Sequence, residues 1–177
     1  MRIAISGTHF SGKSTLIANL LKCFPNFTSV EEPYLLLEEQ GYEFSNPPSV
    51  EDFEQQLDFS VRCIMESSNN TFFDRCPIDC LAYALAIGEV DIDNWIQKME
   101  RAVQLLDLIV FLPIEDRDRI PIPISEDLEL REKVDENLQE ILLNDSLGIL
   151  NDVEVIEAMG SIEKRMRMVK AKIDHFS

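Results

Sequence analysis

A glycine-rich segment near the N-terminus has the residue types that bind a chain of phosphates. Its pattern is G-x-x-x-x-G-K-[ST], and one further hydroxyl follows it. The residues are Gly7, Thr8, His9, Phe10, Ser11, Gly12, Lys13, Ser14 and Thr15. Glycines let such a loop turn tightly, so that successive N–H groups point at one anion, and the helix that follows adds the positive end of its dipole.

Two side chains of this loop have specific chemistry. Lys13 supplies a charge for the β- and γ-phosphates of a nucleotide, and the hydroxyl of Ser14 reaches Mg²⁺. The loop therefore predicts a nucleoside triphosphate such as ATP, together with Mg²⁺, as ligands. His9 either lies beside the phosphates or remains an exposed loop residue.

A second reactive position is the acid that ends the apolar run Thr71-Phe72-Phe73-Asp74. An acid at the end of a buried strand is where nucleotide-binding proteins hold Mg²⁺, so Asp74 is predicted to share the metal with Ser14. Capping of the next helix is the alternative role. Arg75 follows at once and places a cation beside the phosphates. Asp79, in the first turn of that helix, is expected to interact with the helix dipole rather than with a ligand.

A third position is the pair of acids before Pro33. In an open α/β sheet, ligands bind beyond the carboxyl ends of the strands, and this pair follows a short strand-like run. We prefer Glu32 to Glu31 as the carboxylate that accepts the proton of an attacking hydroxyl. Capping of the helix at Pro33 is the alternative.

A charged loop between the fourth strand and an acidic helix carries two arginines, Arg117 and Arg119. Arginines on a mobile segment can close over phosphates, stabilise charge in the transition state and exclude water. The sequence therefore predicts a lid at approximately residues 114–145. A solvated charged loop is the alternative.

The elements around these candidate residues must bring them together at one edge of a sheet. Strands are expected at 3–6, 28–31, 71–74, 108–112 and 153–156, and helices near 13–24, 33–37, 50–64, 77–87, 92–106, 126–143 and 162–173. Apolar strands that alternate with helices are typical of a parallel sheet covered on both faces. We therefore predict an α/β fold with three α/β/α layers, in a single domain that spans residues 1–177.

The composition narrows the classes of partner. Sixteen Lys and Arg oppose 33 Asp and Glu among 177 residues, which gives a net charge of −17. This charge argues against nucleic acid and against an anionic membrane surface, but a local pocket can still bind a small anion. No apolar run reaches the ~20 residues of a membrane helix, and no signal peptide is recognisable. Four cysteines without zinc-site spacing suggest reduced thiols in a cytoplasmic protein. The oligomeric state stays open.

The order of these motifs resembles that of the P-loop nucleoside and nucleotide kinases. Glu32-Pro33 resembles the deoxynucleoside kinases, in which that glutamate is the general base. Asp74-Arg75-Cys76 stands where those kinases have Glu-Arg-Ser, and Asp-Arg instead resembles the thymidylate kinases. The stretch from Met1 to about Lys172 also resembles compact AAA-type ATPase/kinase domains related to ribosylnicotinamide kinase.

The resemblance implies a P-loop NTP hydrolase fold with a five-stranded parallel sheet and a lid around Arg117 and Arg119. It also implies an adenine-binding turn after the fifth strand, at Gly160 and Ser161, and an acceptor site between Glu32 and Asp74. Candidates for acceptor binding are Glu32, Tyr34, Phe53, Gln56, Phe59, Arg62 and Arg75. Gln56 and Arg62 are preferred on the long helix, because most of its apolar residues are expected in the core.

The leading hypothesis is a Mg²⁺-dependent kinase that transfers the ATP γ-phosphate to a small hydroxylated acceptor, either a nucleoside or a nucleotide-like molecule. Its catalytic residues would be Lys13, Glu32, Asp74, Arg75, Arg117 and Arg119. The alternatives are a nucleotide-binding ATPase or regulatory switch without such an acceptor, and a degenerate nucleotide-binding module. The chain has no N-K-x-D guanine signature, and its length leaves little room for the helical lid domain of a motor ATPase.

Overall fold

A single parallel sheet organises the protein. The computed structural model describes residues 1–115 and 121–176. Its five strands are β1 (Arg2–Ser6), β2 (Thr28–Val30), β3 (Thr71–Asp74), β4 (Leu108–Phe111) and β5 (Glu154–Glu157). They pair in the order β2-β3-β1-β4-β5, and every neighbouring pair is parallel. The predicted five-stranded parallel sheet is confirmed.

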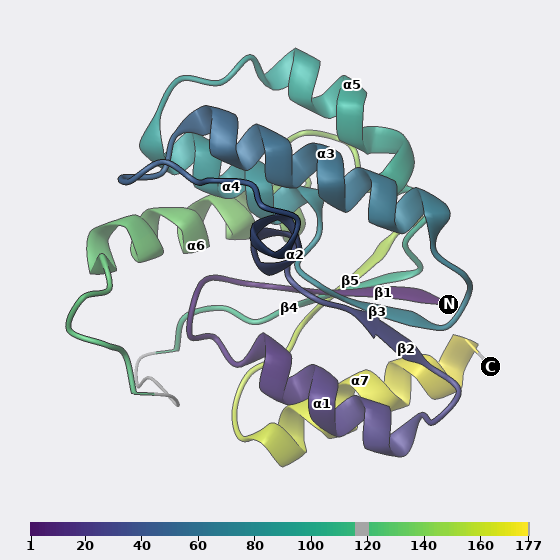
Figure 1. Cartoon of the computed structure of the whole chain (residues 1–177). Coiled ribbons are helices and arrows are strands. Elements are labelled where there is room, and N and C mark those ends of the chain that lie inside the picture. Colours follow the sequence, from purple (N-terminus) through teal and green to yellow (C-terminus); the bar gives the residue numbers. More distant parts are fainter. Residues whose placement is uncertain (116–120, 177) are drawn as a thin grey trace.

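Helices cover both faces of the sheet, as Figure 1 shows. On one face lie α1 (Lys13–Cys23) and α7 (Ile162–Phe176). On the other lie α3 (Val50–Glu66), α4 (Pro77–Ile87), α5 (Ile92–Val103) and α6 (Leu128–Leu142). The short helix α2 (Pro33–Glu39) follows β2 and packs against α3. The three-layer α/β/α architecture is therefore confirmed.

The core divides into two apolar layers because side chains alternate along each strand. Ile3 and Ile5 of β1 point toward α1 and α7, whereas Ala4 points toward α3 and α4. All three are fully buried. Burial on both faces explains why these strands are continuously apolar in the sequence rather than alternating.

Helix boundaries follow local capping chemistry. The hydroxyl of Ser49 accepts the N–H of Asp52 at 3.2 Å, and the Asp52 carboxylate accepts the N–H of Ser49 at 2.8 Å, which forms a capping box at the start of α3. Helix α6 begins at Leu128, two residues later than expected, because the Asp127 side chain caps it by accepting the N–H of Leu130.

Much of the predicted lid is part of the packed core. Val134 and Leu138 of α6 are fully buried, and the side-chain amide of Asn137 donates to the carbonyl of Ala82 in α4 at 2.9 Å. Movement over the phosphates is therefore a prediction only for the segment that precedes α6. Arg117 and Arg119 lie outside the described residues.

Two further features concern the cysteines and the helices. Cys23, Cys63, Cys76 and Cys80 are all free thiols, and Cys76 and Cys80 are buried. Over the ranges 1–115 and 121–176, no helix has the length and apolar character needed to cross a bilayer.

Candidate active site

The glycine-rich segment forms a loop between β1 and α1, and its first glycine cannot be replaced without distortion. Gly7 has φ +146°, and a Cβ built there would lie 2.6 Å from the carbonyl oxygen of Leu112. Gly12 has φ +92° and precedes the first residue of α1. Both glycines therefore meet the conformational requirement that the motif predicts.

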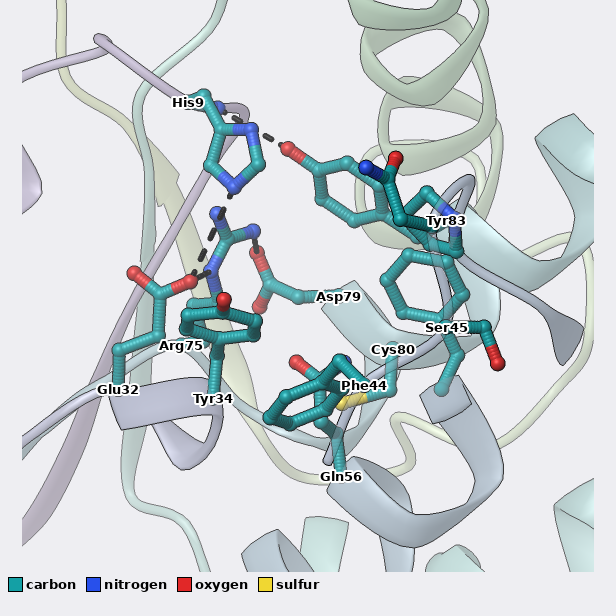
Figure 2. Close-up of a pocket in the computed structure, with 13 residues that line it drawn as sticks. His9, Glu32, Tyr34, Phe44, Ser45, Gln56, Arg75, Asp79, Cys80 and Tyr83 are labelled. Carbon is teal, nitrogen blue, oxygen red and sulfur yellow. Dashed lines mark hydrogen bonds and ion pairs between the residues drawn. The ribbon is translucent and has the colours of Figure 1, made fainter. Parts of the chain in front are cut away.

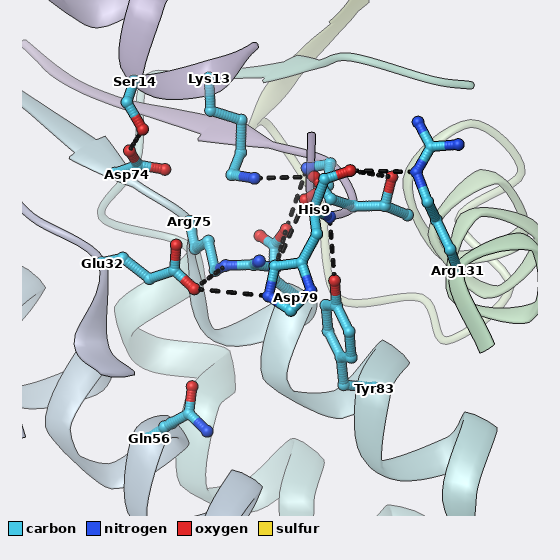
Figure 3. A network of polar contacts seen from close by, with 12 residues as sticks. His9, Lys13, Ser14, Glu32, Gln56, Asp74, Arg75, Asp79, Tyr83 and Arg131 are labelled. Carbon is cyan, nitrogen blue, oxygen red and sulfur yellow. Dashed lines mark hydrogen bonds and ion pairs between the residues drawn. The ribbon is translucent and has the colours of Figure 1, made fainter. Parts of the chain in front are cut away.

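Lys13 is folded back onto this loop. Its Nζ donates to the carbonyl of Thr8 at 2.8 Å, and the side chain is buried. Burial, with the nearby charge of Arg75, lowers the pKa of Lys13 to about 8, although Asp74 and Glu32 act in the opposite direction. The lysine thus occupies the loop that would receive the phosphates of a nucleotide (Figure 3).

Ser14 and Asp74 form an oxygen-rich corner beside the loop. The Ser14 hydroxyl donates to Asp74 Oδ2 at 2.6 Å, whereas Asp74 Oδ1 is buried and has no hydrogen-bond partner among the described residues. Burial raises the pKa of Asp74, and the charge of Lys13 and the Ser14 hydrogen bond oppose that rise. A hydroxyl and a carboxylate with a spare oxygen fit Mg²⁺, which prefers oxygen ligands and keeps several waters.

Glu32 and Arg75 form an ion pair at the carboxyl ends of β2 and β3. Glu32 Oε1 lies 2.8 Å from Arg75 Nε, and Arg75 is buried. Burial alone would raise the pKa of Glu32, but the charges of Arg75 and Lys13 outweigh it and hold that pKa below its ordinary value. Glu32 therefore faces the site as a carboxylate, whereas Glu31 is exposed.

Two residues that were not predicted as site residues hold this arrangement together. Asp79 is fully buried, and its carboxylate accepts the N–H groups of Gly7 at 3.0 Å and of Cys76 at 2.9 Å. Tyr83 places its ring under the Arg75 guanidinium, 4.9 Å from centroid to Cζ, and its hydroxyl accepts the N–H of His9 at 3.0 Å. Positions 75, 79 and 83 are spaced by four, and this spacing was the signal available in the sequence.

The structure adds a second contact to the role expected for Asp79. It does belong to a capping box at the start of α4, as a residue near a helix N-terminus would. Its other oxygen, however, binds the first residue of the phosphate loop, because α4 starts at the same sheet edge as that loop. Asp79 thus connects the two halves of the site.

A cavity of about 450 Å³ opens beside these residues (Figure 2). Its lining includes His9, Glu32, Tyr34, Phe44, Ser45, Asn46, Pro48, Phe53, Gln56, Arg75, Asp79, Cys80 and Tyr83. A smaller cavity of about 290 Å³ lies over the phosphate loop, lined by His9, Phe10, Gly12, Lys13, Ser14, Thr15 and Glu32. His9 and Glu32 line both cavities, so the two spaces meet at these side chains.

Aromatic pairs form part of the wall of the larger cavity. Tyr34 stacks on Phe44 with a centroid distance of 4.3 Å, and Phe53 stacks on Tyr83 at 5.3 Å. Gln56 is buried among them, and its amide nitrogen donates to the backbone at Asp52. The positions predicted at Tyr34, Phe53 and Gln56 therefore do line one space.

The wall segment that contains Phe44 is held by one carboxylate. Asp52 accepts the Tyr42 hydroxyl at 3.0 Å, the N–H of Ser45 at 3.2 Å, and both the N–H and the hydroxyl of Ser49. The residues between Tyr42 and Ser49, which we call the acceptor-side loop, are thus fixed from both ends.

Arg62 does not lie with the other predicted acceptor-binding residues. It is exposed, does not line the cavity, and lies 5.0 Å over the ring of Phe59. Six residues of helix after Gln56 rotate the chain by about 240°, which places Arg62 on a different face of α3. The prediction that Arg62 contacts the acceptor is therefore corrected. Phe59 is a core residue.

The remaining predicted positions lie around the phosphate loop. About half of the His9 side chain is exposed, and its ring lies 3.9 Å from Glu32 and 3.5 Å from Glu126. Partial burial and the charges of Arg75, Lys13 and Arg131 lower the pKa of His9, so the ring is neutral. Gly160, with φ +98°, and Ser161 follow β5 at the same sheet edge.

An arginine of α6 contacts the loop from the lid side. Arg131 is buried, and its Nε donates to the carbonyl of His9 at 3.1 Å (Figure 3). It was not predicted, because its helical position gives no sign that it reaches a loop 122 residues away. Among the described residues, no group of three or more His, Cys, Asp or Glu forms a further metal site.

The fold and the phosphate loop define the class of this chain as a P-loop α/β domain. A family model described as an AAA domain matches residues 2–165, and the chain belongs to that family. No curated protein matches it as a relative.

Solved structures share the fold at low sequence identity. Deoxyadenosine kinase from M. mycoides with products dCMP and a flexible dCDP bound gives a TM-score of 0.69 at 18% identity over 100% of both chains. The same kinase with bound dATP gives 0.64 at 18% identity, over 98% of this chain and 100% of that one. NadR protein in complex with NAD and AMP-PNP gives 0.63 at 17% identity, over 98% of this chain but 48% of that chain.

Proposed function

We propose that this protein is an ATP-dependent kinase that phosphorylates a hydroxyl of a nucleoside-like small molecule. The observation that carries the proposal is the place of Glu32, which lines both the cavity over the phosphate loop and the larger cavity beside it. A carboxylate at such a junction is positioned between a phosphoryl donor and an acceptor. The fold likeness to a deoxyadenosine kinase and to NadR supports the same class of reaction.

The transfer itself needs only a positioned donor, a base and charge stabilisation. The acceptor hydroxyl oxygen would attack the γ-phosphorus, the bond from that phosphorus to the bridging oxygen would break, and ADP would leave. A carboxylate oxygen of Glu32 would take the hydroxyl proton. Lys13 would exchange the Thr8 carbonyl for phosphate oxygens, and Mg²⁺ held by Ser14 and Asp74 would neutralise charge on the phosphates.

The charges around the larger cavity favour a neutral acceptor. Among its described lining residues, Arg75 is the only Lys or Arg, and it is already paired with Glu32 at 2.8 Å and with Asp79 at 3.9 Å. A phosphate monoester there would bring about two negative charges next to two carboxylates. Unphosphorylated nucleosides fit the site better than nucleoside monophosphates.

A screen of ATP consumption over nucleosides, nucleoside monophosphates and nicotinamide riboside tests the proposal. We expect turnover with at least one unphosphorylated nucleoside and its loss in Glu32→Gln. Slow ATP hydrolysis that no acceptor accelerates would contradict the kinase proposal and favour an ATPase or regulatory switch. Absence of Mg-ATP binding in calorimetry would favour a degenerate module.

A further inference from the structure

A buried arginine of α7 joins three segments on the side of the P-loop opposite the larger cavity. Arg165 is 5% exposed. Its Nη1 donates to the carbonyl of Ser11 at 2.6 Å, and its Nη2 donates to Glu115 Oε1 at 2.8 Å. The same Glu115 oxygen accepts the N–H of Gly160 at 2.9 Å. One guanidinium and one carboxylate thus connect the P-loop, the segment after β4 and the turn after β5.

The strand order shows which part of a nucleotide this connection faces. The P-loop follows the central strand β1, and the residues of the larger cavity follow β2 and β3 on one side of it. If the acceptor takes that side, the remainder of the donor nucleotide must extend toward β4 and β5. Glu115 and Gly160 stand after those two strands, at the sheet edge where ligands of open α/β sheets bind.

Stability alone is a weak reason to bury such a pair. Removing an arginine and a carboxylate from water is costly, and a well-packed apolar pair is often as stable as a buried ion pair. An apolar side chain, however, could not bind the Ser11 carbonyl and the Gly160 N–H in one rigid geometry. The pair Arg165–Glu115 fixes these two backbone groups relative to each other, and the strand order puts both segments on the side where the donor nucleotide would extend.

We propose that Arg165 is a positioning residue for the donor nucleotide, which it serves by holding the P-loop directly and the turn at Gly160 through Glu115. This inference rests on the proposed function in one respect, that ATP is the ligand of the P-loop. Contacts to the phosphates and contacts to the base are then coupled, because both surfaces are attached to the same guanidinium.

Calorimetric titration with Mg-ATP and with Mg-tripolyphosphate separates the two kinds of contact, since tripolyphosphate lacks the base and sugar. Glu115→Ala removes the connection to the turn but leaves Arg165 on the P-loop. We expect it to weaken Mg-ATP about tenfold and to change tripolyphosphate binding less than about twofold. Glu115→Gln should restore most of the ATP affinity, because an amide oxygen can still accept from Arg165 and Gly160.

Arg165→Ala is expected to weaken both ligands, since the P-loop loses its own contact. If that variant does not fold, the two Glu115 variants still test the positioning role of Arg165. The matched control is Asp145→Asn, a half-buried carboxylate that accepts the N–H groups of Ile149 and Leu150 and lines neither cavity, so both affinities should stay at the parental value. An equal loss of both ligands in Glu115→Ala, or no loss of either, would overturn the inference.

Failure of the positioning role of Arg165 can be distinguished from failure of the proposed kinase function. A parent protein that binds Mg-ATP but phosphorylates no acceptor contradicts the kinase proposal alone, and the affinity comparison still decides the role of Arg165. A parent protein that binds neither ligand contradicts both.

Discussion

Nε of Arg75 lies 2.8 Å from Oε1 of Glu32, so the proposed base is paired with a buried cation from the neighbouring strand end. The same guanidinium lies over the Tyr83 ring and near Asp79, which fixes its orientation. Arg75 therefore both keeps the Glu32 carboxylate ionised and fixes its position. The same pairing lowers the pKa of Glu32 and so reduces its basicity.

Replacing Glu32 tests its role in proton transfer. Glu32→Gln keeps the size of the side chain and a hydrogen-bond acceptor but removes the proton-accepting carboxylate. We expect kcat to fall about 10²- to 10⁴-fold with little change in Mg-ATP affinity. Glu31→Gln, on the exposed neighbour, is the control and should retain parental kcat. Parental turnover in Glu32→Gln would exclude it as the base.

Removing Lys13 tests the phosphate loop. The Lys13→Ala variant loses the charge proposed to contact the β- and γ-phosphates, so kcat should fall about 10²- to 10³-fold and Mg-ATP binding should weaken. Lys22 lies on the same helix, is exposed, and its Nζ donates to the Asn19 side chain at 3.4 Å, so Lys22→Ala is a matched control. A steady-state assay and calorimetry measure both effects, and equal behaviour of the two variants would contradict the assignment.

The pH profile should depend on Arg75. In the parent, the pKa of Glu32 lies below its ordinary value of 4.5, because Arg75 and Lys13 outweigh the effect of burial. In Arg75→Gln the largest lowering influence is lost while burial remains, so the pKa of Glu32 must rise. The acid limb of the kcat profile should therefore move to higher pH, and thermal unfolding should be followed alongside as a check on folding. An unmoved acid limb would show that Glu32 does not set it.

Asp52 should contribute to stability in a pH-dependent way. Burial raises the pKa of Asp52, but hydrogen bonds from Ser49, Tyr42 and Ser45 outweigh it and lower that pKa below the ordinary value of 3.8. A lowered folded-state pKa stabilises the protein above the unfolded pKa, and this contribution is lost as pH falls through the folded-state pKa. Urea unfolding of Asp52→Asn should show a loss of about 1–3 kcal/mol at pH 7 that shrinks below about pH 4.

The exposed carboxylate of Glu51 provides the comparison for that experiment. Glu51→Gln changes the same helical turn without removing a buried acceptor, so its effect on the free energy of unfolding should stay within about 0.5 kcal/mol. An Asp52→Asn loss that is equally small at pH 7 would mean that the acceptor-side loop does not depend on this carboxylate.

Replacement by alanine should be tolerated less well at Gly7 than at Gly148. Gly7→Ala places a Cβ 2.6 Å from the Leu112 carbonyl oxygen at a φ of +146°, so the loop must shift and Mg-ATP binding should fall. Gly148 also has a positive φ, but a Cβ there meets nothing within 4 Å. Gly148→Ala should therefore cost only about 1–2 kcal/mol of unfolding free energy and leave nucleotide binding unchanged.

The residues that the sequence identified are those whose role depends on local order. The G-x-x-x-x-G-K-[ST] pattern, the strand-ending Asp74 and the choice of Glu32 over Glu31 each rest on positions a few residues from a strand end. Because all parallel strands end at one edge, strand ends alone bring such residues together. The predicted strand and helix order was correct for the same reason, since continuous apolar runs mark strands buried on both faces.

The residues that the sequence missed act across the fold. Asp79 binds Gly7 from 72 positions away, Arg131 binds the carbonyl of His9 from 122, and Arg165 binds that of Ser11 from 154. Each lies on a helix, where an isolated charge is usually a solvated surface residue. Asp79 had one signal in the sequence, its spacing of four from Arg75 and Tyr83, whereas the type and spacing of Arg131 and Arg165 carried none. For Arg62 the prediction was wrong in the opposite direction. Its helix, α3, does line the larger cavity, but Arg62 lies on a face of that helix that points away from it.

The sequence by itself determined the class of fold, the phosphate loop and the carboxylates at the strand ends, because a short motif and hydrophobic periodicity fix local backbone geometry. Only the tertiary structure decided that Glu32 is paired with Arg75, that Asp52 holds the wall of the larger cavity and that Arg165 connects the P-loop to the turn at Gly160. Those contacts depend on which helix faces pack together, and packing joins residues whose separation along the chain is unrelated to their distance in space.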